Sequence, residues 1–377
     1  MTAATPGPSP ARFVRPEIRA LAPYALERDA TAVNLDLNEM PWDLPRRLKG
    51  EIARRLLAAD WARYPDLHAD ALRAALGRRF DWPADGVLLG NGSNELLAMA
   101  LAALAGGGRQ VLLAQPSFGL YRTLIASAGA RALEIGPRAD LALPLAELEA
   151  AIARDPTRPV LLCTPNNPTG EAIAPQRLAT IAERLAAPLL VDSAYGEFSR
   201  HDYRPVLARF PHVVLFGTFS KAWSLAGLRL GYLLADPRLV AELAKAKLPY
   251  NLGRAAAIAG EVTLAESAAL ARRVRAIVAR RPRFAALLAA AGAEVLPSAA
   301  NFVLARFGER ASELARRLAA RGVRLRDLGA GPGLGGCLRV SIGDGRAERA
   351  LARALAAERG AFALPPAGAT YAPRRAR

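Results

Sequence analysis

Short apolar runs alternate with longer amphipathic runs through the middle of the chain. The short runs are rich in Val and Leu, which is typical of buried strands, and the longer runs repeat apolar residues at the spacing of a helix face. Strands are expected at 111–114, 160–163, 189–191, 213–216 and 229–234, and helices at 48–59, 69–80, 96–104, 145–153, 175–185 and 237–245. Strands that alternate with helices indicate an α/β fold with a mostly parallel central sheet flanked by helices.

The pattern changes after residue 250. A helix-compatible run of one or two long helices covers 255–291 and leads into a smaller α+β domain. That domain has strands expected at 294–296, 301–306, 323–327 and 337–342, and helices at 311–320 and 347–359. The expected divisions are a flexible arm (1–20), an N-terminal segment packing with the small domain (21–44), a large domain (45–250), a small C-terminal domain (251–360) and a disordered tail (361–377).

Composition narrows the class of protein. Of the 377 residues, 52% are hydrophobic, which favours a large core over general disorder. Neither a signal-peptide pattern nor an apolar run long enough to span a bilayer is found, so we expect a cytoplasmic protein without a membrane partner. The net charge of +17 comes from Arg spread through Ala/Leu-rich runs without a recognition motif, which disfavours a nucleic-acid partner.

Lysine is rare in this chain and therefore informative. The chain has only three His, and two Cys without metal-type spacing, which disfavours a metal site and a Ser-His-Asp triad. Four of the 51 basic residues are Lys. An amine, unlike a guanidinium, can lose its proton and form an imine, so Lys221 is a candidate nucleophile, although a surface Lys is the alternative. Thr218, Ser220 and Arg229 flank it and suit a phosphate.

Two further loops that follow expected strands carry candidate binding groups. Gly92, Ser93 and Asn94 open a helix, where small residues let backbone N–H groups bind a phosphate, although they also form an ordinary helix cap. The turn over 164–170 contains two Pro and a Gly. Its Asn167 can donate to a phenolate oxygen, and a tight turn without a ligand is the alternative.

A carboxylate at the end of an apolar strand suggests a cationic ligand. Asp192 follows the strand at 189–191, where a buried carboxylate is costly without a cation such as a protonated pyridine nitrogen. Tyr195, three residues later, can bond a neighbouring ring oxygen. Phe118 can supply an aromatic face for the same ring, although a core position is equally compatible with its sequence context.

Together these motifs resemble the fold-type-I pyridoxal-phosphate aminotransferases of class I and II, and most closely the histidinol-phosphate aminotransferase group. The resemblance extends from about residue 21 to residue 355. Its most specific motifs are Pro-Asn-Asn-Pro-Thr-Gly at 165–170, Asp-x-x-Tyr at 192–195, Ser-Lys at 220–221, Ala-Gly-Leu-Arg at 226–229, Ala-Asn-Phe at 300–302 and Leu-Arg-Val at 338–340.

The resemblance implies pyridoxal 5′-phosphate as cofactor and assigns a role to each motif. The implied catalytic residues are Lys221, which would hold the cofactor as a Schiff base, Asp192, which would keep its ring nitrogen protonated, and Tyr195. The implied cofactor-binding residues are Gly92, Ser93, Asn94, Phe118, Asn167, Asp192, Tyr195, Thr218, Ser220, Lys221, Arg229 and, from the neighbouring subunit, Tyr64. The last assignment requires a homodimer with shared active sites.

Strand alternation indicates an anion site in the small domain. Arg326 and Arg339 each face away from the apolar neighbours on their strands and could fork an anion, although two solvated Arg are the alternative. By resemblance, both arginines bind the substrate phosphate with Tyr24, while Asn38 and Asn167 complete the substrate site.

The implied reaction converts histidinol phosphate and 2-oxoglutarate into imidazole acetol phosphate and glutamate, in histidine biosynthesis. The chain departs from the group's usual motifs at Asp36 and Met40, where Asn is more usual, and at Ser193, where Glu is common. These departures leave open an aromatic or broad-range aminotransferase, or a threonine-phosphate decarboxylase, which would need a further anion site. A non-catalytic, cofactor-binding regulatory relative is disfavoured by the intact catalytic set.

Overall fold

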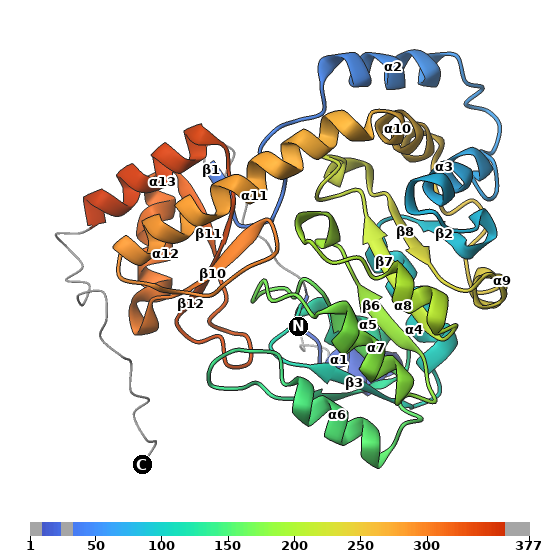
Figure 1. Cartoon of the computed structure of the whole chain (residues 1–377), viewed down its shortest axis with the longest axis horizontal. Coiled ribbons are helices and arrows are strands. Elements are labelled where there is room, and N and C mark those ends of the chain that lie inside the picture. Colours follow the sequence, from blue (N-terminus) through green and yellow to red (C-terminus); the bar gives the residue numbers. More distant parts are fainter. Residues whose placement is uncertain (1–9, 24–32, 359–377) are drawn as a thin grey trace, which may run out of the picture.

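The computed structural model describes residues 10–23 and 33–358, which form two sheets with their covering helices (Figure 1). The larger sheet has seven strands in the order β2-β8-β7-β6-β5-β3-β4. Its strands are β2 (Val87–Gly90), β3 (Gln110–Ala114), β4 (Arg131–Ile135), β5 (Val160–Cys163), β6 (Leu189–Asp192), β7 (Val213–Thr218) and β8 (Gly231–Leu234). Strand β8 runs antiparallel to β2 and β7, and the other neighbouring pairs are parallel.

Helices cover both faces of the larger sheet because both faces are apolar. Along β3, Val111 and Leu113 pack into one hydrophobic cluster, whereas Leu112 and Ala114 pack into another. The helices of this half are α2 (Arg46–Leu57), α3 (Asp70–Phe80), α4 (Ser93–Ala105), α5 (Leu120–Ser127), α6 (Leu145–Arg154), α7 (Pro175–Glu183), α8 (Arg204–Arg209) and α9 (Pro237–Ala244), with the short α1 (Pro16–Arg19) before them. The first cluster includes α4, α5 and α9, and the second includes α3, α6, α7 and α8.

The smaller sheet combines one strand from the N-terminal segment with strands from the C-terminal part of the chain. Its five strands are β1 (Val33–Leu35), β11 (Val323–Asp327), β12 (Cys337–Ser341), β10 (Phe302–Arg306) and β9 (Glu294–Val295), in that order. Its helices are α10 (Arg254–Ala265), α11 (Ser267–Ala290), α12 (Ala311–Ala320) and α13 (Gly345–Glu358). Strand β1 pairs in parallel with β11, so the N-terminal segment supplies an edge strand to the smaller sheet.

The α/β architecture with a mostly parallel sheet is confirmed, and the differences from the sequence prediction are local. Helix α5 was not predicted. Strand β4 was not predicted either, because the exposed Arg131 and the half-buried Glu134 interrupt the apolar pattern of this edge strand. The strand expected from residue 229 begins at Gly231, since Arg229 has a left-handed φ of 53°. The helical run over 255–291 is two helices that meet at Glu266. The domain boundaries stay a prediction.

Within the described ranges, the structure has no helix that combines the length and the apolar character needed to cross a bilayer.

Gly231 is required at the start of β8, the strand that runs antiparallel to both of its neighbours. A Cβ on Gly231 would lie 2.3 Å from the backbone C of Gly92 and 2.3 Å from the backbone N of Ser93. Backbone atoms cannot rotate out of the way as a side chain can, so any side chain at position 231 must displace the loop before α4.

We expect Gly231→Ala to lower the free energy of unfolding by about 1–3 kcal/mol, the usual cost of overpacking. Urea denaturation followed by circular dichroism measures this change. The matched control is Gly50→Ala in α2, where a Cβ meets no atom within 4 Å. That variant should gain roughly 0.5–1 kcal/mol because Ala favours a helix over Gly. Equal stabilities for the two variants would contradict the packing argument.

Candidate active site

The loop between β2 and α4 forms a cradle for an anion. Gly92 has a φ of 80°, and a Cβ there would lie 2.5 Å from a guanidinium nitrogen of Arg229. Ser93 is the first residue of α4 and is buried, and the half-buried Asn94 follows in the same turn. The unsatisfied N–H groups and positive dipole end of a 13-residue helix therefore lie beside a guanidinium group.

Two buried hydroxyls complete this cradle from the end of β7. The Thr218 hydroxyl donates to Ser220 Oγ at 3.0 Å, and Arg229 Nη1 donates to the same Ser220 oxygen at 3.1 Å. The structure thus brings together the loop before α4 and the loop after β7, which the sequence predicted separately as phosphate sites.

Lys221 follows these hydroxyls and is half-buried. Its Nζ donates to the carbonyl oxygen of Leu37 at 2.8 Å and lies 6.0 Å from the centroid of the Tyr195 ring. Burial and the cations Arg339 and Arg229 lower the pKa of the Lys221 amine to about 8, although Glu39 and Asp192 act in the opposite direction. A sizeable fraction of the amine is therefore neutral and nucleophilic near neutral pH.

Asp192 ends strand β6 and is buried. The Tyr121 hydroxyl donates to its Oδ2 at 2.7 Å, and the backbone N–H of Ala194 donates to its Oδ1 at 3.0 Å. Burial raises the pKa of Asp192, while the bond from Tyr121, the bond from Ala194 and the charge of Lys221 lower it. Within residues 10–23 and 33–358 the carboxylate forms no ion pair, so it is suited to a cationic ligand.

Tyr121 was missed from the sequence. It is fully buried at the start of α5, a helix that the hydrophobic pattern did not predict, and its bond to Asp192 spans 71 residues. The available signal was its spacing, because Tyr121 lies three residues after Phe118 and the two rings meet edge to face at 5.5 Å.

Tyr195 receives hydrogen bonds from two asparagines. Asn38 Nδ2 donates to its hydroxyl oxygen at 3.0 Å and Asn167 Nδ2 at 3.5 Å. The Tyr195 ring packs edge to face on Phe302, with centroids 5.0 Å apart. Burial raises the pKa of the phenol to about 12, against the lowering effects of Arg339 and Asn38, so the hydroxyl keeps its proton and can donate.

Arg339 reaches the same place from the smaller sheet. Its Nη1 donates to Asn167 Oδ1 at 2.6 Å and its Nη2 to the carbonyl oxygen of Asp36 at 2.5 Å. Arg326 lies directly opposite Arg339 in the antiparallel pairing of β11 and β12, so both side chains stand on one face of the sheet. The two arginines predicted from strand alternation are therefore neighbours.

Asn38 connects the two sheets, which the sequence did not indicate. It is buried in a left-handed conformation with φ of 56°. Besides its bond to Tyr195, it donates through its backbone N–H to Ser341 Oγ at 2.9 Å and accepts from that hydroxyl through Oδ1 at 3.0 Å. Asn301 Nδ2 donates to the Asn38 carbonyl oxygen at 2.9 Å. Ser341 was missed from the sequence, whereas Asn301 belonged to a motif without a role.

The loops around Lys221 and Tyr195 are tied together behind the site. Trp223 Nε1 donates to Glu197 Oε1 at 2.9 Å, and burial raises the pKa of that carboxyl group. Both residues were missed because the sequence does not show that the loop after Lys221 and the loop after Tyr195 meet.

Two sequence-predicted residues do not join this cluster. Tyr64 is 77% exposed and stacks on Tyr250, with ring centroids 4.4 Å apart. Tyr24 lies outside the described residues. In the part of the chain that the structure describes, no group of His, Cys, Asp or Glu is arranged to hold a metal ion.

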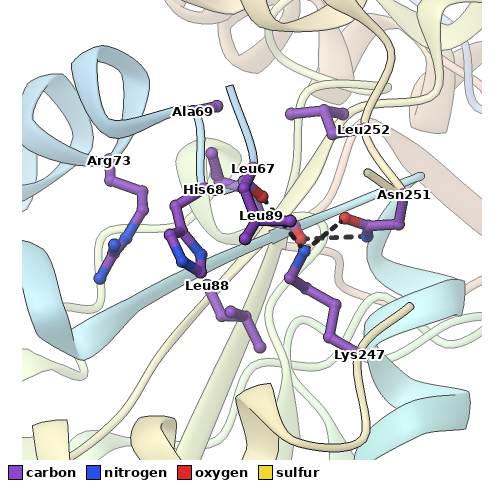
Figure 2. Close-up of a pocket in the computed structure, with 9 residues that line it drawn as sticks. All are labelled: Leu67, His68, Ala69, Arg73, Leu88, Leu89, Lys247, Asn251 and Leu252. Carbon is purple, nitrogen blue, oxygen red and sulfur yellow. Dashed lines mark hydrogen bonds between the residues drawn. The ribbon is translucent and has the colours of Figure 1, made fainter. Parts of the chain in front are cut away.

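A small cavity of about 10 Å³, the size of one water, is lined by nine residues, among them Leu89 of β2, Lys247 and Asn251 (Figure 2). Lys221 is not among them. Lys247 Nζ donates to Asn251 Oδ1 at 2.8 Å, while Asn251 Nδ2 donates to the Leu89 carbonyl oxygen at 3.3 Å and to Glu95 Oε2 at 2.7 Å. Glu95 Oε2 in turn accepts from the backbone N–H of Asn91. The polar groups at this cavity therefore fix the loop that precedes α4.

A larger cleft of about 390 Å³ lies between the N-terminal segment and α13. Glu39, Met40 and Asp344 are among its lining residues. Glu39 is also one of the groups whose charge acts on the pKa of Lys221.

Comparison with known proteins gives a consistent result. The family model of aminotransferase class I and II matches residues 30–357. Histidinol-phosphate aminotransferase 1 of Carboxydothermus hydrogenoformans is 36% identical over 91% of this chain and 98% of the relative, and histidinol-phosphate aminotransferase of Deinococcus radiodurans is 35% identical over 94% and 99%. The crystal structure of histidinol-phosphate aminotransferase from Sinorhizobium meliloti in complex with pyridoxal-5′-phosphate superposes with a TM-score of 0.81 at 27% identity, covering 90% of this chain and 95% of that one.

The lowered pKa of Lys221 predicts its chemical reactivity. Only a neutral amine attacks trinitrobenzenesulfonate, so labelling of Lys221 in the ligand-free protein should be slow below pH 8 and reach half its maximal rate near the pKa of about 8. Peptide mapping of labelled protein across a pH series measures this rate, and Lys221→Arg removes the signal. Half-maximal labelling above about pH 10, as for an unperturbed lysine, would contradict the effect of burial.

Proposed function

The chain belongs to the class I and II aminotransferase family, and we propose that it is the pyridoxal 5′-phosphate-dependent transaminase that takes histidinol phosphate as amino donor. The products are imidazole acetol phosphate and, from 2-oxoglutarate, glutamate. The observation that carries this proposal is the pair Arg326 and Arg339, which stand opposite each other, with Arg339 bonded to Asn167. The names of the relatives support it. The expected family resemblance, transaminase activity and cofactor agree with these comparisons.

The residues present fit the cofactor at both of its ends. Its phosphate is a strong anion, and the α4 N-terminus, Thr218, Ser220 and Arg229 form an anion cradle. Its ring nitrogen binds a proton, and the buried carboxylate of Asp192 accepts hydrogen bonds but has no ion pair in the described part of the chain. We assign Phe118 to the ring face and Asn167 and Tyr195 to the ring oxygen.

The cofactor, when bound, supplies an aldehyde for covalent attachment and a ring that takes up electrons from the substrate Cα. Lys221 would hold the aldehyde through Nζ, and its free amine would act as the base that takes the proton from the substrate Cα. The carbonyl oxygen of Leu37 orients this amine. Asp192, oriented by Tyr121, keeps the proton on the ring nitrogen, and Tyr195 donates its phenolic hydrogen.

Arg326 and Arg339 bind the donor's phosphate away from the reacting carbon. Two guanidinium groups on adjacent strands form charge-assisted bonds to several phosphate oxygens at once. Arg339 is held by Asn167 and by the Asp36 carbonyl before substrate arrives, so its position is fixed in advance. An α-carboxylate can occupy the same place, which is why an aromatic or broad-range amino donor stays the second candidate.

We expect Arg326→Ala and Arg339→Ala to separate these substrates. Arg339→Ala should lower kcat/KM roughly ten- to a hundredfold for phosphorylated and carboxylate donors alike, because one charge-assisted contact set is lost. Arg326→Ala should do so selectively for histidinol phosphate. Steady-state kinetics with histidinol phosphate, Phe, Tyr, Leu and phosphothreonine measures this, with the exposed Arg316→Ala in α12 as control. A wild-type preference for Phe or Leu over histidinol phosphate would refute the substrate assignment and leave transamination intact.

We further propose that two copies of the chain share their active sites. Exposed apolar side chains gather on the connection between α2 and α3 and on the loop after α9: Leu57, Trp61, Tyr64, Leu248 and Tyr250. Arg254 Nη2 holds the Tyr64 carbonyl oxygen at 3.0 Å. A patch of this kind is suited to a partner surface. In such a homodimer Tyr64 would reach the cofactor phosphate of the neighbouring subunit.

The expected cytoplasmic location of the protein stays a prediction.

Shared sites predict complementation between two inactive variants. Lys221→Ala lacks the amine, and Tyr64→Ala lacks the hydroxyl offered to the partner, so a mixed dimer has one site that keeps both groups. Refolding the two variants together should restore up to about a quarter of the wild-type activity, from random pairing. Each variant refolded alone is the control. A fully active wild-type monomer in sedimentation experiments would refute the shared site.

A further inference from the structure

Asp36 lies beside both arginines of the anion site. It directly follows β1, whose parallel register with β11 ends at Leu35 opposite Leu325, so Asp36 continues next to Arg326. Its carbonyl oxygen accepts from Arg339 Nη2 at 2.5 Å. Asp36 is the first residue after this strand, and alternation continued from the buried pair Leu35 and Leu325 would direct its side chain to the face that carries Arg326.

The Asp36 carboxylate is buried and incompletely bonded. The residue is only 6% exposed, and within the described chain its Oδ1 has no hydrogen-bond partner. A buried carboxylate is costly unless positive charge lies near it. The cations that the fold places around residue 36 are Arg339, which donates to its carbonyl oxygen, and Arg326, one position beyond the paired Leu325 on the adjoining strand. The carboxylate therefore belongs to the electrostatics of the anion site even though no salt bridge fixes it in place.

We propose that Asp36 is a specificity-determining residue that sets the net charge of the anion site and so limits its preference for dianions over monoanions. This inference rests on the proposed function, in which one site alternately receives a phosphorylated amine and a carboxylate-bearing oxo acid. The two arginines make the site cationic, and the negative charge of Asp36 lowers its net charge by one, so a phosphate is held without excluding the carboxylate that must follow it.

The proposal has a quantitative signature. The Coulomb energy between Asp36 and a bound anion is proportional to the charge of that anion. Removing the Asp36 charge should therefore strengthen binding of a dianion by about the square of the factor found for a monoanion. With water-like screening, two unit charges about 4 Å apart change affinity by a factor of roughly five, so we expect about fivefold for acetate and roughly twenty-five-fold for phosphate.

The test measures binding of inorganic phosphate and of acetate to the holoenzyme by calorimetry at about pH 8, where phosphate is mostly the dianion. The cofactor occupies the other anion cradle, and Arg339→Ala identifies binding elsewhere. Asp36→Asn removes the charge at constant shape, and Asp36→Glu retains the charge. Asp327→Asn is the matched control, because it makes the same charge change on the exposed residue next to Arg326.

The expected result is tighter binding of both anions by Asp36→Asn, with the squared relation, and little change for Asp36→Glu and Asp327→Asn. Two outcomes would overturn the role of Asp36 and leave the proposed function standing. In the first, Asp36→Asn increases the affinity for the two anions by the same factor. In the second, wild type binds phosphate through Arg339 but Asp36→Asn does not bind it more tightly. Failure of wild type to bind phosphate in an Arg339-dependent manner would overturn the anion site itself, and this inference with it.

Discussion

The buried hydrogen bonds of Asn38 are the constraint on which the rest of the site depends. The Asn38 side chain is bonded to Tyr195 in the loop after β6 of the larger sheet and to Ser341 on the smaller sheet, while the backbone carbonyl of Asn38 accepts from Asn301. Each of these groups is buried, so an unmade bond would leave a polar atom without water. The two sheets are consequently held at one separation, and the segment between them delivers the Leu37 carbonyl to Lys221. The left-handed backbone at Asn38 is compatible with this role because Asn tolerates that conformation better than most residues.

The electrostatics of the site follow from what this assembly buries. Arg339 and Arg229 approach Lys221 from different sheets, and their charges add to burial in lowering the pKa of the amine. Asp192 opposes them but is itself desolvated, and its pKa is raised. Arg229 belongs to the same loop as Lys221, whereas the burial of the amine and the charge of Arg339 also need the other parts of the molecule. The reactive amine is thus a product of the assembled site, and not of the short motif alone.

The sequence predicted the parts of the site that are local and missed those that are made at a distance. Gly92, Asp192 and Lys221 follow strand ends, so motif spacing and the apolar pattern suffice to locate them. Arg326 and Arg339 were found from strand alternation, and the register of β11 and β12 brings them together. Tyr121, Ser341 and the pair of Trp223 and Glu197 act through partners that no local pattern specifies. The edge strand β4 was missed because none of its residues is fully buried and two of the five are charged, which removes the continuous apolar signal of a central strand.

The pairing of β1 with β11 has a consequence for synthesis of the chain on the ribosome. Asn38 and Ser341 are 303 residues apart in sequence, so the N-terminal segment is translated long before its partner strand exists. The larger sheet can fold as soon as its own strands have emerged, whereas Val33–Leu35 must wait without a place in any sheet. Until the last strands are made, Leu37 cannot orient the amine of Lys221. The site around Lys221 therefore cannot be complete before the last strands of the smaller sheet have been made.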